Sequence, residues 1–280
     1  MADEIKPPLT VVILTFKEEI NLPGALESVV AWADQVFVVD SFSTDKTLEI
    51  ARKYEAQVYQ NIWVDWATQR NWALDHLPIK NEWVLFLDAD ERVSPELAEE
   101  IRETLINVPN EVCGFYVKRK FVFLGRWLRH GGLFPNFILR IVRKDKTRVT
   151  MIGAWEYFRV HGKTLKMKNS VIHKDNKTLT HWINKHNQYA DNEAKAIREN
   201  KKYIEIGSNG ELERKQKVKL RGYIWNRLPL LQRSFFPFFT RYVIQRGFLD
   251  GIEGFIYYFL HDFWYPFLVD AKVLELKKRK

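Results

Sequence analysis

The sequence predicts an α/β fold followed by a helical extension that is rich in aromatic and basic side chains. Short apolar runs alternate with helical patterns over roughly the first ninety residues, which is typical of a parallel sheet of the nucleotide-binding type. One run, residues 83–87, has no polar alternation and stops at Asp88 and Asp90, as expected of a central strand covered on both faces. After about residue 200 the chain changes character, because Lys, Arg and aromatic residues accumulate.

The predicted strands of the first part are short and β-branched, and the helices between them have apolar positions three or four residues apart. Asn21 followed by Pro23 marks one helix start, and the polar residues at positions 43–45 mark another. In chain order, we expect a strand at residues 9–16, a helix from 21, a strand at 35–40, a helix after 45, a strand at 56–60, a helix at 63–77 and the strand at 83–87.

The second part of the predicted domain begins with a helix that Ser94 caps ahead of Pro95 and that runs to about residue 107. The further expected elements are strands at residues 112–124 and 137–143, shorter strands at 153–160 and 170–173, and a helix at 180–199. We therefore predict one α/β domain at residues 1–200 and a basic, aromatic helical region at residues 201–280.

The composition limits the class of protein. The chain has 280 residues, enough for a sizeable core, and its formal net charge of +9 favours an anionic partner such as a phosphorylated substrate, nucleic acid or an acidic membrane. The single cysteine, Cys113, excludes an internal disulfide framework and fits a reducing compartment. No signal-peptide pattern is present, and no apolar run approaches the roughly 18 residues that span a bilayer. We therefore expect a cytoplasmic protein.

The candidate site lies where residues 83–87 end. In open α/β sheets, ligands bind outside the carboxyl ends of the strands, and here Asp88 and Asp90 follow directly. Carboxylates this close repel one another and attract a cation, and oxygen ligands suit Mg²⁺ or Mn²⁺ that also holds phosphate oxygens. The alternative is that both are polar loop residues ahead of the helix that starts at Ser94.

The C-terminal segment at residues 223–267 holds 16 of the 40 aromatic residues of the chain. The charged residues that interrupt it are Arg241, Arg246, Asp250, Glu253 and Asp262. Such interruptions are wrong for a spanning helix but fit amphipathic helices that lie in a membrane interface, and the terminal KKRK would add attraction to an anionic leaflet. The alternatives are contact between copies in a homo-oligomer and a plain hydrophobic core.

Four motifs in register resemble the family-2 glycosyltransferases with the GT-A fold. They are LTVVILTFKEE from residue 9, VVDSFSTDKT from 38, TQRNWAL from 68 and VLFLDADE from 84. Further along, PNFILRIVRKD from residue 135, WEYF from 155 and VIH from 171 are similar to the lipopolysaccharide-core and surface-polysaccharide branch, including the WaaE-type enzymes. The resemblance implies a Rossmann-like mixed sheet and the transfer of a sugar from a nucleotide-diphosphate donor.

The resemblance implies a nucleotide-sugar pocket at the strand ends. The donor-binding residues that it implies are Thr15, Phe16, Glu18, Asp40, Arg70 and Asp88. Within this set, Asp40 would hydrogen-bond the base or ribose, Asp88 the ribose or sugar, and Arg70 would pair with diphosphate oxygens. The alternatives are that Asp40 only closes a strand-end turn and that Arg70 lies on a helix surface.

The resemblance also implies a metal ion and a general base. Asp90 would bind Mn²⁺ or Mg²⁺ bridging the diphosphate, and His173 would complete the metal shell unless it is a structural histidine. The reaction would be a single displacement with inversion, in which a carboxylate removes the proton of the acceptor hydroxyl. We assign this role to Glu156, unless it is a surface carboxylate, with Asp175 and Glu91 in reserve.

Two positions depart from the pattern of similar enzymes. Lys17 stands where the family often has Asn, and Trp155 stands where such relatives commonly have His. No Gly-rich phosphate loop follows the first strand, which argues against a Rossmann dehydrogenase or a Walker-type NTPase. Arg140 and Arg143 are candidates to contact an anionic acceptor, the alternative being that they face solvent.

The predicted function is transfer from a donor such as UDP-glucose to a saccharide or lipid-linked acceptor in bacterial surface-polysaccharide or lipopolysaccharide synthesis. The alternative is a catalytically degenerate scaffold of the same fold, against which the presence of Asp88 and Asp90 argues. No RNA-binding signature accompanies the basic C-terminal third, so we expect no nucleic-acid partner. We expect the protein at the cytoplasmic face of the inner membrane, with a homo-oligomer formed through the C-terminal region as the other use of that region.

Overall fold

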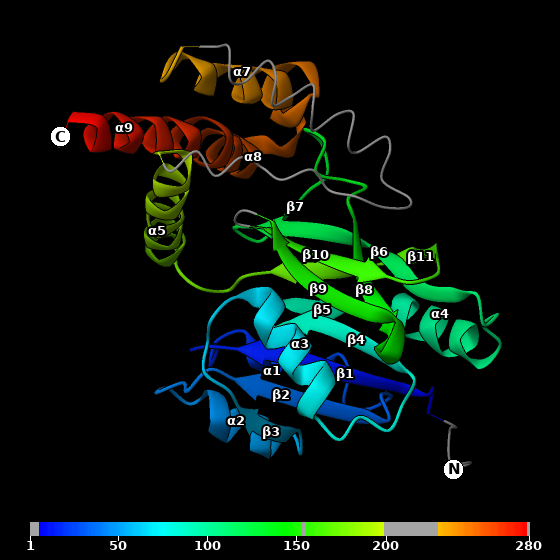
Figure 1. The fold of residues 1–280 in the computed structure, drawn as a ribbon. Helices are drawn as coiled ribbons and strands as arrows, with labels where there is room; N and C mark the ends of the chain where they lie inside the picture. Colours follow the sequence, from blue (N-terminus) through cyan, green and yellow to red (C-terminus); the bar gives the residue numbers. More distant parts are fainter. Residues whose placement is uncertain (1–5, 153–154, 199–228, 279–280) are drawn as a thin grey trace. The chain divides into compact units, whose positions relative to one another are not determined.

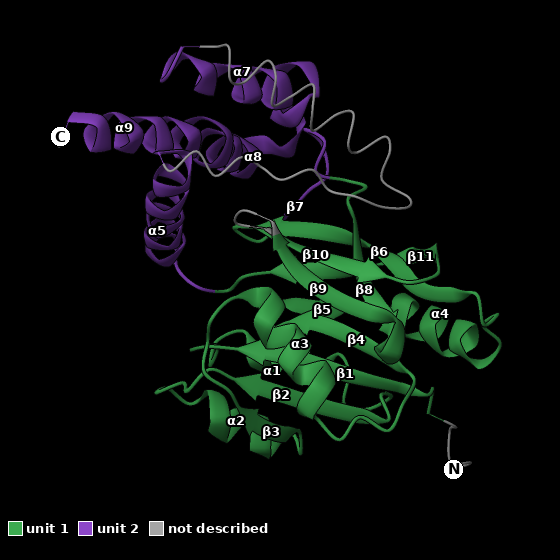
Figure 2. Ribbon diagram, viewed as in Figure 1, with its two compact units in different colours: residues 1–125, 134–151, 156–176 green, residues 126–133, 152–155, 177–280 purple. Residues whose placement is uncertain are grey.

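A computed structural model describes residues 6–152, 155–198 and 229–278 of the chain (Figure 1). The chain divides into two compact units (Figure 2). Unit 1 comprises residues 1–125, 134–151 and 156–176, and unit 2 comprises residues 126–133, 152–155 and 177–280. The predicted domain boundary at residues 200 and 201 lies outside the described residues, as does most of the basic stretch that precedes residue 233.

Unit 1 is built on a mixed sheet whose first four strands are parallel, as the alternation of strands and helices predicted. The next strand, β8, runs antiparallel to β4. From one edge to the other, the strands are β3 (Gln57–Gln60), β2 (Gln35–Asp40), β1 (Leu9–Thr15), β4 (Trp83–Asp88), β8 (Phe137–Arg143), β6 (Val112–Phe123), β11 (Lys163–Lys174) and β5 (Glu91–Val93).

Both faces of this sheet are covered. Helices α1 (Leu22–Glu27), α2 (Thr47–Lys53) and α4 (Pro95–Ile106) pack on one face, and α3 (Trp66–His76) packs on the other with the hairpin of β9 (Thr147–Ile152) and β10 (Trp155–Val160) (Figure 1). A 3-10 turn, η1 (Lys144–Lys146), joins β8 to β9. Successive residues of β1 and β4 enter opposite cores, which is why both strands are apolar without alternation.

Local sequence signals set the helix starts. Ser94 accepts a hydrogen bond from the backbone nitrogen of Leu97 at 3.2 Å, so its predicted capping of α4 is confirmed. Asp65 caps α3 in the same way through the backbone nitrogen of Thr68 at 2.7 Å. These caps fix where each helix begins, and therefore which side chains of α3 point towards the strand ends.

Three strands differ from the prediction. β5 and β9 were not expected, because β5 has only three residues and β9 alternates apolar with polar side chains. β11 extends over Lys163–Lys174, although only residues 170–173 were predicted. Nine of its twelve side chains are exposed or half-buried, including the first four, so it shows no continuous apolar run.

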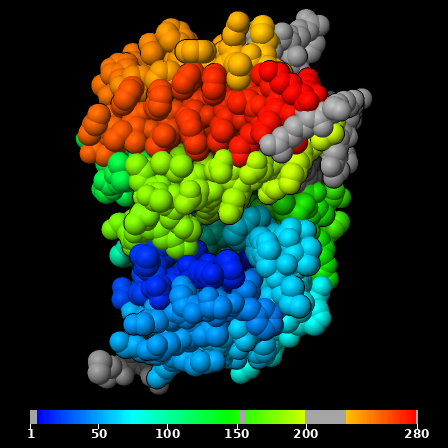
Figure 3. Space-filling view, turned by 90° about the vertical axis from the view of Figure 1, so that its left-hand side faces the viewer, coloured from blue at the N-terminus to red at the C-terminus, as the bar shows by residue number. Residues whose placement is uncertain are grey.

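Unit 2 is mostly helical, as predicted for the C-terminal region. Its elements are β7 (Arg126–Leu128), α5 (Leu179–Arg198), η2 (Gln232–Ser234), α7 (Phe235–Phe238), the π-helical η3 (Phe239–Ile244), η4 (Gly247–Asp250), α8 (Gly251–Tyr258), the π-helical η5 (Phe259–Trp264) and α9 (Tyr265–Lys278). Figure 3 shows α9 (red) beside α5 (yellow-green), where Lys272 donates to Asp191 at 2.6 Å. Within the described ranges, no helix combines the length and apolarity that crossing a bilayer requires.

Candidate active site

The carboxyl ends of three parallel strands meet at one edge of the unit 1 sheet. The register pairs Thr15 of β1 with Asp40 of β2, and Leu14 of β1 with Asp88 of β4. The chain then turns through Asp90 into β5. The residues that the motifs single out therefore converge at the edge where an open α/β sheet binds its ligands.

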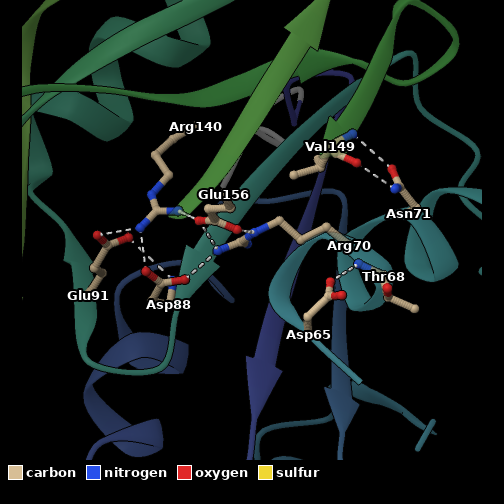
Figure 4. A network of polar contacts seen from close by, with 9 residues as sticks. All are labelled: Asp65, Thr68, Arg70, Asn71, Asp88, Glu91, Arg140, Val149 and Glu156. Carbon is tan, nitrogen blue, oxygen red and sulfur yellow. Dashed lines mark hydrogen bonds and ion pairs between the residues drawn. The ribbon is translucent and has the colours of Figure 1, made fainter. Parts of the chain in front are cut away.

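A network of five charged side chains lies at this edge (Figure 4). Arg70 of α3 donates through Nη2 to Asp88 Oδ1 at 2.8 Å and through Nε to Glu156 Oε2 at 2.6 Å. Arg140 of β8 donates through Nη2 to Asp88 and, at 2.8 Å, to Glu91 Oε1, and its Nη1 lies 3.6 Å from Glu156 Oε1. Three carboxylates thus share two guanidinium groups drawn from different elements.

Burial within this network divides the charges into two layers. The side chains of Arg70 and Arg140 are 1% and 5% exposed, and that of Glu91 is fully buried. The side chains of Asp88 and Glu156 are 28% and 23% exposed. A ligand approaching this edge therefore meets two carboxylates, with the guanidinium groups behind them.

The same arrangement sets the protonation of the carboxylates. Burial alone would raise the pKa of Asp88, but the charges of Arg140 and Arg70 outweigh it and lower this pKa to about 2. Burial raises the pKa of Glu91, and the nearby charge of Asp88 adds to the rise even though Arg140 opposes it. Asp88 therefore stays ionised at neutral pH, and Glu91 accepts a proton before Asp88 does.

Asp90 and His173 form a second polar pair next to the network. Asp90 Oδ2 lies 3.3 Å from His173 Nε2, and each side chain is 19% exposed. The His173 ring stacks on Phe121, with the ring centroids 5.0 Å apart. Burial would lower the pKa of His173, but the charge of Asp90 and the hydrogen bond to it outweigh burial and raise this pKa.

This pair fits a divalent cation that a substrate also binds. The part of the chain that the structure describes contains no cluster of three His, Cys, Asp or Glu side chains placed to hold a metal. Mg²⁺ sites commonly use one or two protein ligands and complete their shell with substrate phosphates and water. A carboxylate oxygen and an imidazole nitrogen at 3.3 Å match that kind of site.

Arg92 is a site residue that sequence reasoning missed. Its Nη1 donates to the carbonyl oxygens of Lys174 at 2.9 Å and Asp90 at 3.4 Å. The backbone nitrogen of Lys174 also donates to the carbonyl oxygen of Asp90, at 2.8 Å. These bonds tie the turn that carries Asp90 to the end of the strand that carries His173. Gly24 makes room for this guanidinium, because a Cβ there would lie 2.4 Å from Arg92 Nε.

Asp40 is fully buried and its carboxylate is occupied by the protein itself. It accepts hydrogen bonds from Thr15 Oγ1 at 3.0 Å, from the backbone nitrogen of Ser43 at 2.8 Å and from Gln60 Nε2 at 3.2 Å. In this geometry Asp40 closes the turn after β2, which was the alternative interpretation of the sequence. A direct contact of Asp40 with a nucleotide stays a prediction.

The loop after β1 explains the unusual Lys17. This residue has a φ of +55°, in the left-handed region that Asn adopts more readily than Lys, so the Asn of similar enzymes suits the same backbone. The backbone nitrogen of Lys17 donates to Ser43 Oγ at 2.8 Å, and this hydrogen bond stabilises the left-handed backbone conformation. Phe16 is 53% exposed at the strand end, and the half-buried Glu18 accepts from Asn21 at 2.9 Å. The lysine therefore leaves the loop geometry in place.

Two further candidates, Asp175 and Arg143, are engaged by other parts of unit 1. Asp175 accepts a hydrogen bond from Asn21 Nδ2 at 2.9 Å. Arg143 pairs with Trp83 at the opposite end of β8, and its guanidinium carbon lies 4.6 Å from that ring centroid. Its contact with an acceptor stays a prediction. Neither Arg140 nor Arg143 faces solvent, since both are buried.

Comparison with known proteins adds three findings. The model of a family described as glycosyl transferase family 2 matches residues 10–162. A Rickettsia typhi protein described as an uncharacterized glycosyltransferase is 27% identical over 278 residues, covering 94% of this chain and 86% of its own length. A similarly described Rickettsia bellii protein is 39% identical over 101 residues, and that match spans 36% of this chain and 34% of the relative's length.

Among solved structures, a mannosyltransferase of Pyrobaculum calidifontis in complex with GDP-mannose and Mn²⁺ aligns with a TM-score of 0.52 at 15% identity. The alignment covers 99% of this chain and 89% of that one. At this identity the similarity shows the fold, and it confirms the predicted α/β class with a helical C-terminal region.

Proposed function

We propose a function from one established premise: the chain belongs to glycosyl transferase family 2 and is a glycosyltransferase with a GT-A fold. We propose that it transfers a sugar from a nucleotide-diphosphate donor, UDP-glucose being the first to test, with inversion and with the help of Mn²⁺ or Mg²⁺. The acceptor would be a saccharide or lipid-linked saccharide of bacterial surface-polysaccharide or lipopolysaccharide synthesis, a class that only the sequence resemblance supports.

One observation carries this proposal. The pair of Asp90 and His173 lies next to two partly exposed carboxylates, Asp88 and Glu156, at the carboxyl edge of the sheet. A cation site beside an ionised carboxylate is what single displacement at a nucleotide sugar requires. The cation would stabilise the negative charge of the leaving diphosphate, and the carboxylate would remove the proton of the acceptor hydroxyl.

In this proposal Asp90 and His173 hold the cation. When bound, such an ion acts as a Lewis acid that offsets the negative charge developing on the leaving diphosphate. The similar Pyrobaculum structure holds Mn²⁺ and GDP-mannose, which supports the class of cofactor and donor but does not choose between UDP and GDP. Arg92 supports the site by fixing the main chain on both sides of it.

Glu156 is the best placed of the three candidate bases. Glu91 is fully buried and hydrogen-bonded to Arg140, and Asp175 is held by Asn21. Glu156 is 23% exposed, and its two oxygens accept from Arg70 at 2.6 and 3.0 Å. This bidentate contact fixes the orientation of the carboxylate. Arg70 therefore acts by positioning Asp88 and Glu156.

The test is a donor screen followed by two variants. UDP-, GDP-, dTDP- and CMP-sugars are compared by thermal shift with Mn²⁺, and nucleotide release is then measured with the donor that binds. We expect Asp90→Asn to abolish the metal-dependent part of the rate, and Glu156→Gln to lower turnover by about 10²- to 10⁴-fold with donor binding retained. Asp75→Asn, an exposed carboxylate on α3, is the matched control.

Two results would count against the proposal. Full activity of Asp90→Asn with unchanged dependence on the cation would remove Asp90 from the metal site. Failure of every donor to bind or react would favour the alternative of a degenerate scaffold with this fold.

A further inference from the structure

Unit 2 presents two stripes of exposed apolar side chains. In α7 and η3, Phe235, Phe239 and Val243 are exposed four residues apart, so they lie on one side of the helical segment. From η4 through α8, Phe248, Ile252 and Phe255 are exposed at intervals of four and three and also share a side. Beside these residues, Phe236, Ile244 and Leu249 are exposed as well. We call these residues the outer apolar face; its main members, between 40% and 65% exposed, are Phe235, Phe239, Val243, Phe248, Ile252 and Phe255.

Ring contacts join the two stripes into one surface. The ring centroids of Tyr242 and Phe255 are 5.6 Å apart. Tyr242 also meets Phe248 at 6.4 Å. The two helical segments therefore pack side by side, and their exposed side chains form a contiguous apolar area of the kind that marks an interaction surface.

Three acidic residues of unit 2 turn inward, whereas the side chain of Glu253 is 26% exposed and pairs with Arg126. Asp250, Asp262 and Asp270 are 1%, 3% and 0% exposed. Asp270 pairs with Arg233 through Nε at 2.8 and 2.9 Å, and Asp262 accepts from Arg241 Nη1 at 2.8 Å. These carboxylates therefore add no negative charge to the outer apolar face.

Asp250 is held in the same way by the chain around it. It accepts from the backbone nitrogens of Arg129 at 3.2 Å and His130 at 3.0 Å, and from Tyr258 Oη at 3.1 Å. Over residues 235–259, unit 2 thus buries Asp250 and exposes several aromatic side chains, while the partly exposed Glu253 is paired with Arg126. This inverts the usual order of a water-facing surface, and it fits a surface that faces an apolar phase.

The charge next to the outer apolar face is positive. Arg246 is exposed at the turn between the two stripes, and Arg126 is 48% exposed beside Glu253, at 3.6 Å. Pairing of two copies through this face would place two Arg246 side chains at one interface, whereas anionic headgroups would neutralise them. The charge therefore favours a lipid leaflet over a second copy.

We propose that the outer apolar face docks on a bilayer with anionic headgroups, inserting its aromatic and aliphatic side chains into one leaflet while Arg246 contacts the headgroups. Short helical segments broken at Gly247 and Gly251 lie in the interface plane in this arrangement, as expected for a monotopic surface. The inference concerns unit 2 by itself and does not depend on which donor or acceptor the enzyme uses.

The test is co-sedimentation of the full chain with vesicles. We expect binding to vesicles of phosphatidylcholine mixed with phosphatidylglycerol, weaker binding to phosphatidylcholine alone, and a further loss at high salt. The triple variant Phe239→Ser, Phe248→Ser, Ile252→Ser should lower the partition coefficient by about tenfold or more, because each buried apolar side chain contributes to insertion. Arg246→Glu should weaken binding to the anionic vesicles more than to the neutral ones.

The control changes exposed apolar residues of unit 1. Ile62→Ser with Ile106→Ser removes side chains that are 71% and 66% exposed, and binding should stay as in the wild type. Circular dichroism and the thermal shift with donor show whether each variant is folded, so a failure to bind lipid is distinguished from a failure of the enzyme.

Three outcomes overturn the proposal. The wild-type protein could stay in the supernatant with both kinds of vesicle, or the folded triple variant could bind as the wild type does. The third is a dimer in light scattering that the triple variant converts to a monomer while neither protein binds vesicles, which would make a second copy the occupant of the face.

Discussion

Both units bury carboxylates beside arginines, but they share the charges differently. In unit 2, Asp270 has its own partner, Arg233, and is 0% exposed. In unit 1, Asp88 and Glu156 share Arg70 and remain 28% and 23% exposed. A carboxylate with a private partner fastens one part of the chain, whereas carboxylates that share a partner and stay accessible can meet a ligand. The comparison separates buried carboxylates that stabilise the fold from accessible carboxylates that can contact a ligand.

The largest expected effect comes from removing the shared partner. Arg70→Met leaves Asp88 and Glu156 facing a gap in their network, so the free energy of unfolding should fall by about 3–5 kcal/mol, and sugar transfer should be lost. Urea denaturation of the purified variant measures the first effect. The control is Arg148→Met, whose pair with Asp75 is exposed and should contribute less than about 1 kcal/mol. Equal losses in the two variants would contradict a special role for the network.

A smaller effect is expected from a carboxylate of unit 2 that is hydrogen-bonded only within its own unit. Asp250→Asn weakens the contacts with two backbone nitrogens, with Tyr258 and with His130 Nδ1 at 2.6 Å, which should cost about 1–3 kcal/mol of stability. The donor-induced rise in melting temperature should be unchanged, because none of these groups belongs to unit 1. Thermal unfolding with and without donor measures both quantities. If the donor no longer raised the melting temperature of this variant, the carboxylates of unit 2 could not be separated in function from those of unit 1.

The effect that is smallest at neutral pH concerns a half-buried histidine. Burial lowers the pKa of His186 to about 4, although a hydrogen bond with the Trp182 carbonyl opposes the shift. An unfolded His binds its proton near pH 6.5, so between pH 6.5 and about 4 the unfolded state holds more protons and stability falls as the pH falls. Melting temperatures across this range should decline less in His186→Gln than in the wild type. Parallel curves would show that this histidine does not set the pH dependence.

The sequence predicts the strands that are buried on both faces. Residues 9–15, 35–40 and 83–88 are continuous apolar runs because each contacts two cores, and their ends follow from the polar residues after them. The three residues of β5 give no such signal, because their extended conformation depends on pairing with β11, where Glu91 lies opposite His173. Pairing of that kind is decided by distant parts of the chain.

The candidate site is predictable to the same degree. The motifs indicate that Asp88, Asp90 and Arg70 gather at one edge, since each lies in or beside an element of the parallel sheet. The bidentate contact of Arg70 with Glu156 joins residues that are 86 positions apart, through a hairpin whose first strand was not predicted. No pattern of neighbouring residues in the sequence predicts a contact between residues 86 positions apart. The position of Arg143 has a similar cause, because an antiparallel strand carries its last residue away from the site.

Gly24 bears on how this enzyme can be made more stable. Glycine within a helix costs about 1 kcal/mol relative to alanine, so a search guided by helix propensity would select Gly24→Ala in α1. The added methyl would overlap the guanidinium of Arg92, which secures the segments that carry Asp90 and His173. A thermostabilised version of this protein should therefore keep its glycine at position 24. The helix propensity lost there leaves space for the arginine that orders the segments carrying Asp90 and His173.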